Sequence, residues 1–111
     1  MTINEYQALA MTTANPALSE KERLINGVMG LCGESGEAID LVKKHLAQGH
    51  ELDQAHLAKE LGDVAWYLAQ TATAIGYDLE TIFSMNIEKL KARYPEGFEQ
   101  KRSAVRAQGD I

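Results

Sequence analysis

The chain has 111 residues, of which 45% are hydrophobic, and this fits one small globular domain rather than a disordered segment or two domains. Its net charge of −5 argues against a nucleic-acid-binding surface, and no apolar stretch reaches the roughly eighteen residues that a membrane span needs. A single cysteine excludes an internal disulfide, and without a basic-then-apolar signal layout we expect a cytoplasmic protein.

Helix start and stop signals define the first half of the chain. Thr2 is a candidate N-cap for a helix over residues 3–11. Ser19, with a glutamate at the capping-box position, predicts a long helix over residues 20–48. Gly49 follows as a C-terminal stop, because glycine readily adopts the left-handed conformation that ends many helices.

The second half repeats this layout. Asp53 and Asp78 are candidate N-caps for helices over residues 54–75 and 79–93, and Pro95 ends the last one. No strand pattern is present, so we predict an all-α helical bundle of about four helices. Residues 1–98 form this single domain, and residues 99–111 are expected to be a polar, flexible tail.

Two similar acidic motifs are the most informative feature of the chain. Glu34 and Glu37 lie in the second predicted helix, and Glu60 and Asp63 lie in the third. Within each pair the spacing is i,i+3, which places both carboxylates on one face of a helix. Each pair lies at about 60° and about 120° from a leucine of the apolar stripe on its helix. If the two helices pack antiparallel, the four acids meet at one rim of the interface.

Such a cluster predicts a site for a hard divalent cation, because carboxylate oxygens are the preferred ligands and unneutralised carboxylates repel. The alternative is a solvated boundary beside the apolar stripe, which is the commonest place for a helical glutamate. Several glycines inside the predicted helices favour close approach of another backbone or a ligand, since each costs about 1 kcal/mol relative to alanine. They are Gly30, Gly33, Gly36 and Gly62.

The fourth predicted helix carries a complementary polar face. Asn86, Lys89 and Arg93 occupy positions i, i+3 and i+7 and so form one continuous face. Beside four acids, this face suggests a polyanion held by metal on one side and by cations on the other, with a triphosphate as the obvious candidate. Alternatively, the cations stabilise the helix C-terminus and are solvated. Tyr94 could stack on a base or cap the core.

The third predicted helix is apolar on most of its circumference, and Trp66 lies opposite its main stripe. A helix of this kind is buried on several sides, so we predict a homo-oligomer whose interface uses it. In the alternative, the first helix or the tail covers Trp66 within one chain. Cys32 lies in the middle of the second predicted helix, and we expect a buried, inert thiol.

Together these motifs resemble the signature of the MazG-like nucleotide pyrophosphohydrolases. Glu34-x-x-Glu37 is followed after 22 residues by Glu60-x-x-Asp63, and the segment N-I-E-K-L-K-A-R-Y-P-E-G-F resembles the family's segment after the metal helices. The opening N-E-Y-Q resembles small, single-domain, phage-type members. The likeness covers residues from about 3 to 98. One departure is Gly33, which stands where many members have the first of two consecutive acids. The site therefore has four carboxylates, which concerns the binding of a second or third metal ion more than that of the first.

The resemblance implies a helical bundle assembled from two chains, as a homodimer or homotetramer. It also implies cleavage of a nucleoside triphosphate between the α and β phosphates, to a monophosphate and pyrophosphate, in nucleotide-pool housecleaning. The implied cofactor is Mg²⁺, with Mn²⁺ as a substitute, held by the four catalytic acids. Asn86, Lys89, Arg93 and Tyr94 are the implied substrate-binding residues.

Two other classes of protein remain as alternatives. A di-iron carboxylate bundle uses Glu-x-x-His motifs, and neither acidic motif here ends in histidine. A non-catalytic helical binding or regulatory module with an acidic metal-binding rim is the second alternative, and it makes the matched offsets of the acids a coincidence. The base, the sugar, and the choice between standard and damaged nucleotides are left open.

Overall fold

The computed structural model describes residues 1–111 and is all-α, which confirms the predicted fold class. Its helices are α1 (Ile3–Met11), α2 (Glu20–Gln48), α3 (Gln54–Ala74), α4 (Leu79–Arg93) and α5 (Gln100–Ala104). The first four agree with the predicted helices to within a residue, whereas the short α5 was not predicted. None of the helices combines the length and the apolar character that crossing a membrane requires.

The predicted caps set the helix boundaries. Each N-cap side chain accepts a hydrogen bond from the backbone N–H three residues further on, and these caps are Thr2, Ser19, Asp53 and Asp78. Gly49 and Gly76 follow α2 and α3 with φ angles of 72° and 79°, in the left-handed region that favours glycine. Local hydrogen bonds therefore determine where each long helix begins and where α2 and α3 end.

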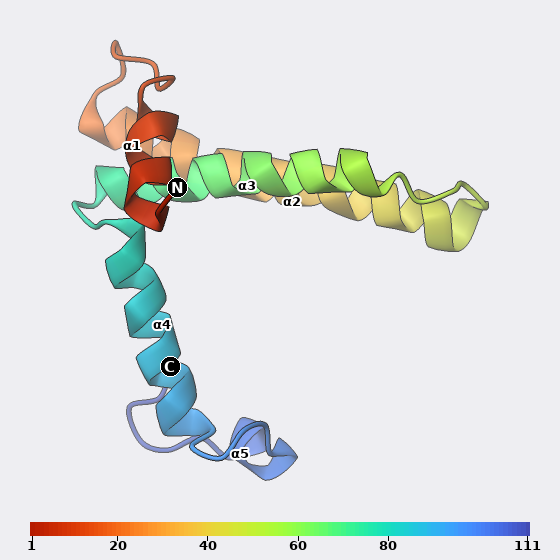
Figure 1. The fold of residues 1–111 in the computed structure, drawn as a ribbon, viewed down its shortest axis with the longest axis vertical. Coiled ribbons are helices and arrows are strands. Elements are labelled where there is room, and N and C mark those ends of the chain that lie inside the picture. Colours follow the sequence, from red (N-terminus) through yellow and green to blue (C-terminus); the bar gives the residue numbers. More distant parts are fainter.

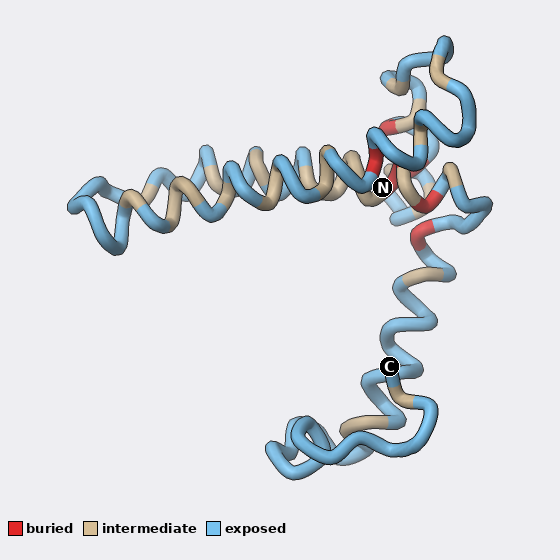
Figure 2. The backbone as a smooth tube through the Cα atoms, turned by 180° about the vertical axis from the view of Figure 1, so that it is seen from behind, coloured by how far each residue is buried: buried red, intermediate tan, exposed pale blue.

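The helices form two arms rather than a closed bundle. In Figure 1, α2 and α3 run antiparallel as one arm, α1 packs against one end of it, and α4 projects away from that end. The radius of gyration is 17.1 Å, compared with about 13 Å for a compact chain of this length. Only 7 of 111 residues are buried, and Figure 2 shows them at the end of the arm where α1, α2, α3 and α4 come together. One chain alone therefore lacks the core of a complete bundle.

The small core at this junction is held by a buried polar side chain. Gln7 of α1 donates through Nε2 to Thr73 Oγ1 (2.9 Å) and to the Tyr77 carbonyl oxygen (3.1 Å). Its Oε1 accepts a hydrogen bond of 2.7 Å from the backbone N–H of Leu79. Gln7 thus joins α1 to the end of α3 and the start of α4. The apolar residues of this core are Ala10, Ala69, Ala72 and Leu79.

Trp66 of α3 is partly covered within the same chain. Its Nε1–H donates to the carbonyl oxygen of Ala10 (3.1 Å) and to Thr13 Oγ1 (2.8 Å). Of the two alternatives, the first helix therefore covers this side chain, and Trp66 gives no argument for a second chain. The prediction of a buried thiol was wrong for the single chain, because Cys32 lies on a face of α2 that this chain leaves exposed.

The two long helices are in close contact at glycines of α2. A Cβ added at Gly27 would lie 3.2 Å from the backbone N of Thr71, and one at Gly30 would clash with the ring of Tyr67. Gly30 is therefore closely approached, but by a side chain rather than by the backbone or ligand that was predicted, and the glycine that meets a backbone is Gly27, which the sequence analysis did not single out. No atom of this chain lies within 4 Å of a Cβ added at Gly33, Gly36 or Gly62.

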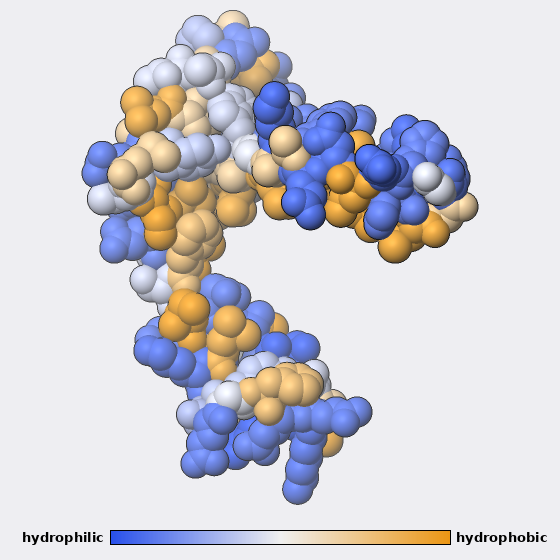
Figure 3. Space-filling model, turned by 45° about the vertical axis from the view of Figure 1, so that its right-hand side comes forward, coloured by the Kyte–Doolittle hydropathy of each residue, from blue (hydrophilic) through white to orange (hydrophobic).

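Apolar side chains remain uncovered along both arms. Figure 3 shows apolar residues gathered along the lower side of the α2–α3 arm and again on α4. On α2 the exposed side chains include Ile25, Met29, Ile39 and Leu46. These residues are not needed to hold the single chain together.

Candidate active site

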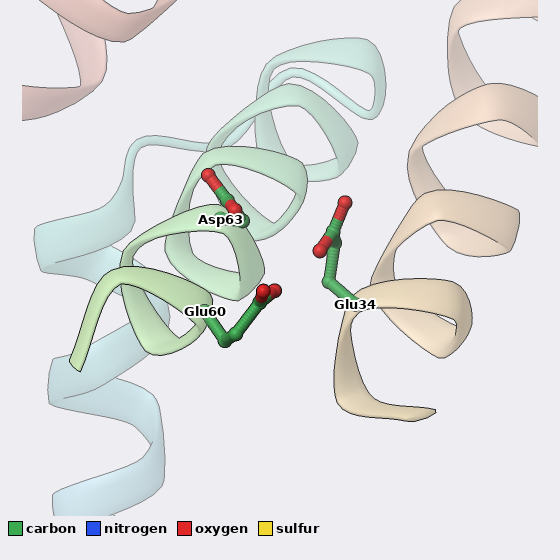
Figure 4. A group of neighbouring side chains, drawn as sticks. All are labelled: Glu34, Glu60 and Asp63. Atoms are coloured by element: carbon green, nitrogen blue, oxygen red, sulfur yellow. The ribbon is translucent and has the colours of Figure 1, made fainter. Parts of the chain in front are cut away.

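Three carboxylates meet between the long helices. α2 supplies Glu34, and α3 supplies Glu60 and Asp63, each with an oxygen atom within 4.8 Å of an oxygen of the other two. Figure 4 shows Glu34 pointing across the gap between the helices toward the pair on α3. The i,i+3 spacing places Glu60 and Asp63 on one face of α3, and the close packing at Gly27 and Gly30 brings Glu34 opposite them.

Glu37 is the predicted site residue that stays outside this group of three. Its side chain is exposed on α2, one turn beyond Glu34. Its negative charge nevertheless contributes to the raised pKa of Glu34, so it lies within electrostatic reach of the group. The structure therefore brings three of the four predicted acids together and leaves the fourth beside them.

The electrostatics of the group favour a cation. Burial raises the pKa of the Glu34 carboxyl, and a hydrogen bond to Glu60 and the charges of Asp63, Glu60 and Glu37 raise it further. These negative charges facing one another are stabilised by a proton or by a bound cation. His56 lies beside the group rather than in it, with its Nε2 3.2 Å from Glu60 Oε1.

Aromatic residues line the space next to the acids. An open hollow of about 330 Å³ is bounded by Glu34, Asp63, Trp66 and Tyr67. The two aromatic rings pack edge to face, with their centroids 5.0 Å apart and their planes at 81°. A flat ligand group in this hollow would contact aromatic surface, while a metal ion held by the carboxylates would be needed before an anionic part of the same ligand could face them.

Sequence reasoning did not single out Tyr6 of α1. Burial raises the pKa of its phenol, and the negative charge of Asp63 raises it further, which places Tyr6 near the carboxylate group. The segment N-E-Y-Q that contains Tyr6 was noted in the sequence, but the proximity of Tyr6 to Asp63 depends on how α1 packs against α3. No spacing rule within one helix reveals it.

The predicted phosphate-binding face lies elsewhere in the chain. Asn86 and Lys89 are exposed on α4, and Arg93, at the end of that helix, is paired with Asp110. Tyr94 packs against Phe98 with ring centroids 5.4 Å apart, at the same end of α4. Because α4 projects away from the α2–α3 arm (Figure 1), these residues do not meet the acids of their own chain.

Comparison with known proteins identifies the family of the chain. Residues 24–98 match the profile of the MazG nucleotide pyrophosphohydrolase domain. The chain belongs to this family. It is also 36% identical over 108 residues to the Gene 37 protein of Mycobacterium phage L5, and the alignment covers 90% of this chain and 95% of that protein. No solved structure matches the chain.

The MazG match includes both acidic motifs and the polar face of α4, whereas α1 and Asp110 lie outside it. MazG enzymes are nucleotide pyrophosphohydrolases and generally depend on a divalent metal. Within this MazG domain, the group of Glu34, Glu60 and Asp63 is the cluster of acids that could hold such an ion.

Proposed function

We propose that the protein is a Mg²⁺-dependent nucleoside triphosphate pyrophosphohydrolase that cleaves its substrate to a nucleoside monophosphate and pyrophosphate. The observation that carries this proposal is the convergence of three carboxylates from two helices, beside an aromatic hollow, in a MazG domain. Housecleaning of the nucleotide pool is the proposed role, with standard and modified nucleotides both admissible as substrates.

The donor set fits Mg²⁺, or Mn²⁺ as a substitute, because it consists of carboxylate oxygens that repel one another without a cation. Glu34, Glu60 and Asp63 would hold the ion, and Glu37 is proposed as a fourth acid that turns toward it. A bound Mg²⁺ would neutralise phosphate charge and lower the pKa of the attacking water. One of the carboxylates would accept the proton of that water, and Trp66 or Tyr67 would contact the base.

Asn86, Lys89 and Arg93 are proposed to bind the phosphates, with Tyr94 as a further substrate-binding residue that stacks on the base, and a second copy of the chain would bring them to the acids. At a rise of 1.5 Å per residue, Asp63 lies about 17 Å along α3 from Ala74, and Arg93 lies about 21 Å along α4 from Leu79. Since α4 leaves the end of α3 in another direction, each of these two lengths increases the distance between Asp63 and Arg93. A site that uses both groups therefore needs α4 from a partner.

The exposed face of α2 supports this assembly. Ile25, Cys32, Ile39 and Leu46 recur every seven residues along the helix, and all four are exposed. Apolar residues at this spacing form the seam between helices packed as in a coiled coil. With so few residues buried in one chain, we propose that this face packs against a second copy in a homodimer or homotetramer.

Pyrophosphate release tests the function. Purified protein would be incubated with standard and modified nucleoside triphosphates, in Mg²⁺ and in EDTA. We expect release only with metal, and we expect Asp63→Asn and Glu37→Gln to abolish it without loss of helix content. Asp40→Asn is the matched control, because Asp40 pairs with Lys44 on the surface at 2.7 Å.

A folded, oligomeric protein that releases no pyrophosphate across the panel would contradict the proposal and favour a non-catalytic binding module. An active Glu37→Gln protein would remove Glu37 from the assignment. Release that persists in EDTA would contradict the metal dependence.

A further inference from the structure

The segment 107–111 folds back onto the end of α4 and presents a carboxylate to Arg93. Asp110 Oδ2 accepts a hydrogen bond of 2.7 Å from Arg93 Nε, and Oδ1 accepts one of 2.6 Å from Nη2. Both side chains are only 10% exposed. This bidentate geometry is the one in which a guanidinium recognises a carboxylate or a phosphate.

The pair differs from the other ion pairs of the chain. The remaining pairs join residues three or four apart in sequence and involve at least one well-exposed partner. Arg93 and Asp110 are 17 residues apart, and both are largely shielded from water. Their contact therefore depends on the folding of the intervening segment and is not an incidental pairing along one helix.

The turn before Asp110 aims its side chain at α4. The backbone N–H of Asp110 donates to the Ala107 carbonyl oxygen at 3.1 Å, and Gly109 has a φ of 86°. Only glycine adopts that left-handed φ without strain, so this residue allows the tight return of the chain.

Lys89 lies at the same place. With Ala92 and residues 107–111 it lines a hollow of about 330 Å³. The guanidinium of Arg93 holds the pKa of the Asp110 carboxyl below its usual value, and Arg106 and Lys89 add to this effect. The carboxylate thus lies on Arg93, with Lys89 lining the same hollow, where an anionic ligand of this face would bind.

We propose that the segment 107–111 is an autoinhibitory latch in which Asp110 takes the place of a substrate phosphate on Arg93. This inference rests on the proposed function, in which Arg93 and Lys89 bind the triphosphate. Substrate has to displace Asp110 before Arg93 can bind a phosphate. The contact between Arg93 and Asp110 therefore breaks when substrate binds. The apparent affinity for triphosphate therefore equals the affinity of the open form multiplied by the fraction of molecules in which the latch is open, and it falls as that fraction falls.

Steady-state kinetics on the full chain test the latch. Asp110→Asn preserves the size of the side chain but removes its charge, so we expect KM for the triphosphate to fall about tenfold with kcat within about twofold. Glu99→Gln is the matched control, since Glu99 makes only an exposed pair with Arg102, and its KM should equal that of the wild type. An Asp110→Asn protein with the wild-type KM, or a control with the same drop, would overturn the latch.

Hydrogen exchange on the wild-type protein gives a second readout that involves no catalysis. Inorganic tripolyphosphate, added in EDTA so that the metal site takes no part, should increase amide exchange in residues 107–111. Unchanged exchange at saturating tripolyphosphate overturns the latch even if nucleotides are cleaved. Increased exchange in a protein that cleaves no nucleotide leaves the latch standing and refutes the proposed function, so the two failures are distinguishable.

Discussion

Replacement of Gly27 by alanine tests the packing that brings the acids together. A Cβ at this position would lie 3.2 Å from the backbone N and 3.3 Å from the Cα of Thr71, and closer still to Thr71 Oγ1. That hydroxyl donates to the Tyr67 carbonyl oxygen at 2.8 Å and has little freedom to move. The backbone of α3 therefore has to give way, and the two helices must separate.

One favourable and two unfavourable free energies decide the magnitude. Alanine is favoured over glycine within a helix by about 1 kcal/mol. Overpacking of a tight interface costs about 1–3 kcal/mol, and a weakened Thr71 hydrogen bond costs about 1 kcal/mol more. The net expectation is a loss of about 2 kcal/mol in the free energy of unfolding, or about 8 °C in Tm for a chain of this size.

Thermal unfolding followed by far-ultraviolet circular dichroism measures this effect. All variants should be compared at one protomer concentration, because the Tm of an oligomer depends on concentration. Gly33→Ala is the control with the opposite sign: its added Cβ meets no atom of the chain within 4 Å, so it should gain about 1 kcal/mol. A Gly27→Ala protein that melts at or above the wild-type temperature would refute the reasoning. Because Glu34 moves with α2, the same variant should also show a smaller Mg²⁺-induced rise in Tm.

Three other perturbations have clear expected outcomes. The pKa of Glu34 is raised in the folded state, so the contribution of this group to the stability of the metal-free protein is fully present below its unfolded pKa and is lost as pH rises through its folded pKa. The difference in Tm between the wild type and Glu34→Gln, measured in EDTA across this range, isolates this loss from the opposite effect of the acids whose pKa is lowered; a difference that does not change with pH contradicts the assignment. Ile39→Glu places a charge on a side chain that is 66% exposed in one chain, and sedimentation velocity should show a smaller species if a second copy covers it. An unchanged oligomer excludes this face as the interface. Trp66→Phe removes the donor to Ala10 and Thr13, so Tm should fall by about 4–8 °C, corresponding to about 1–2 kcal/mol; an unchanged Tm shows that the hydrogen bonds are not needed.

The sequence alone determined the first four helices and the pairing of acids within α2 and α3. Capping by Thr2, Ser19, Asp53 and Asp78 joins atoms three residues apart, so no distant part of the chain is needed to predict it. The i,i+3 spacing of Glu60 and Asp63 places them on one face for the same local reason. The offsets from the apolar stripes also predicted correctly that Glu34 would face the α3 pair.

Only the tertiary structure decided how these parts meet. Glu37 shares the local geometry of Glu34, yet the crossing of α2 and α3 leaves it outside the group of three. The direction in which α4 leaves α3 separates Arg93 from the acids, and it depends on how Gln7 bridges three elements. The pairing of Arg93 with Asp110 likewise spans 17 residues. Periodicity describes each helix by itself, whereas these outcomes depend on contacts between residues that are distant in sequence.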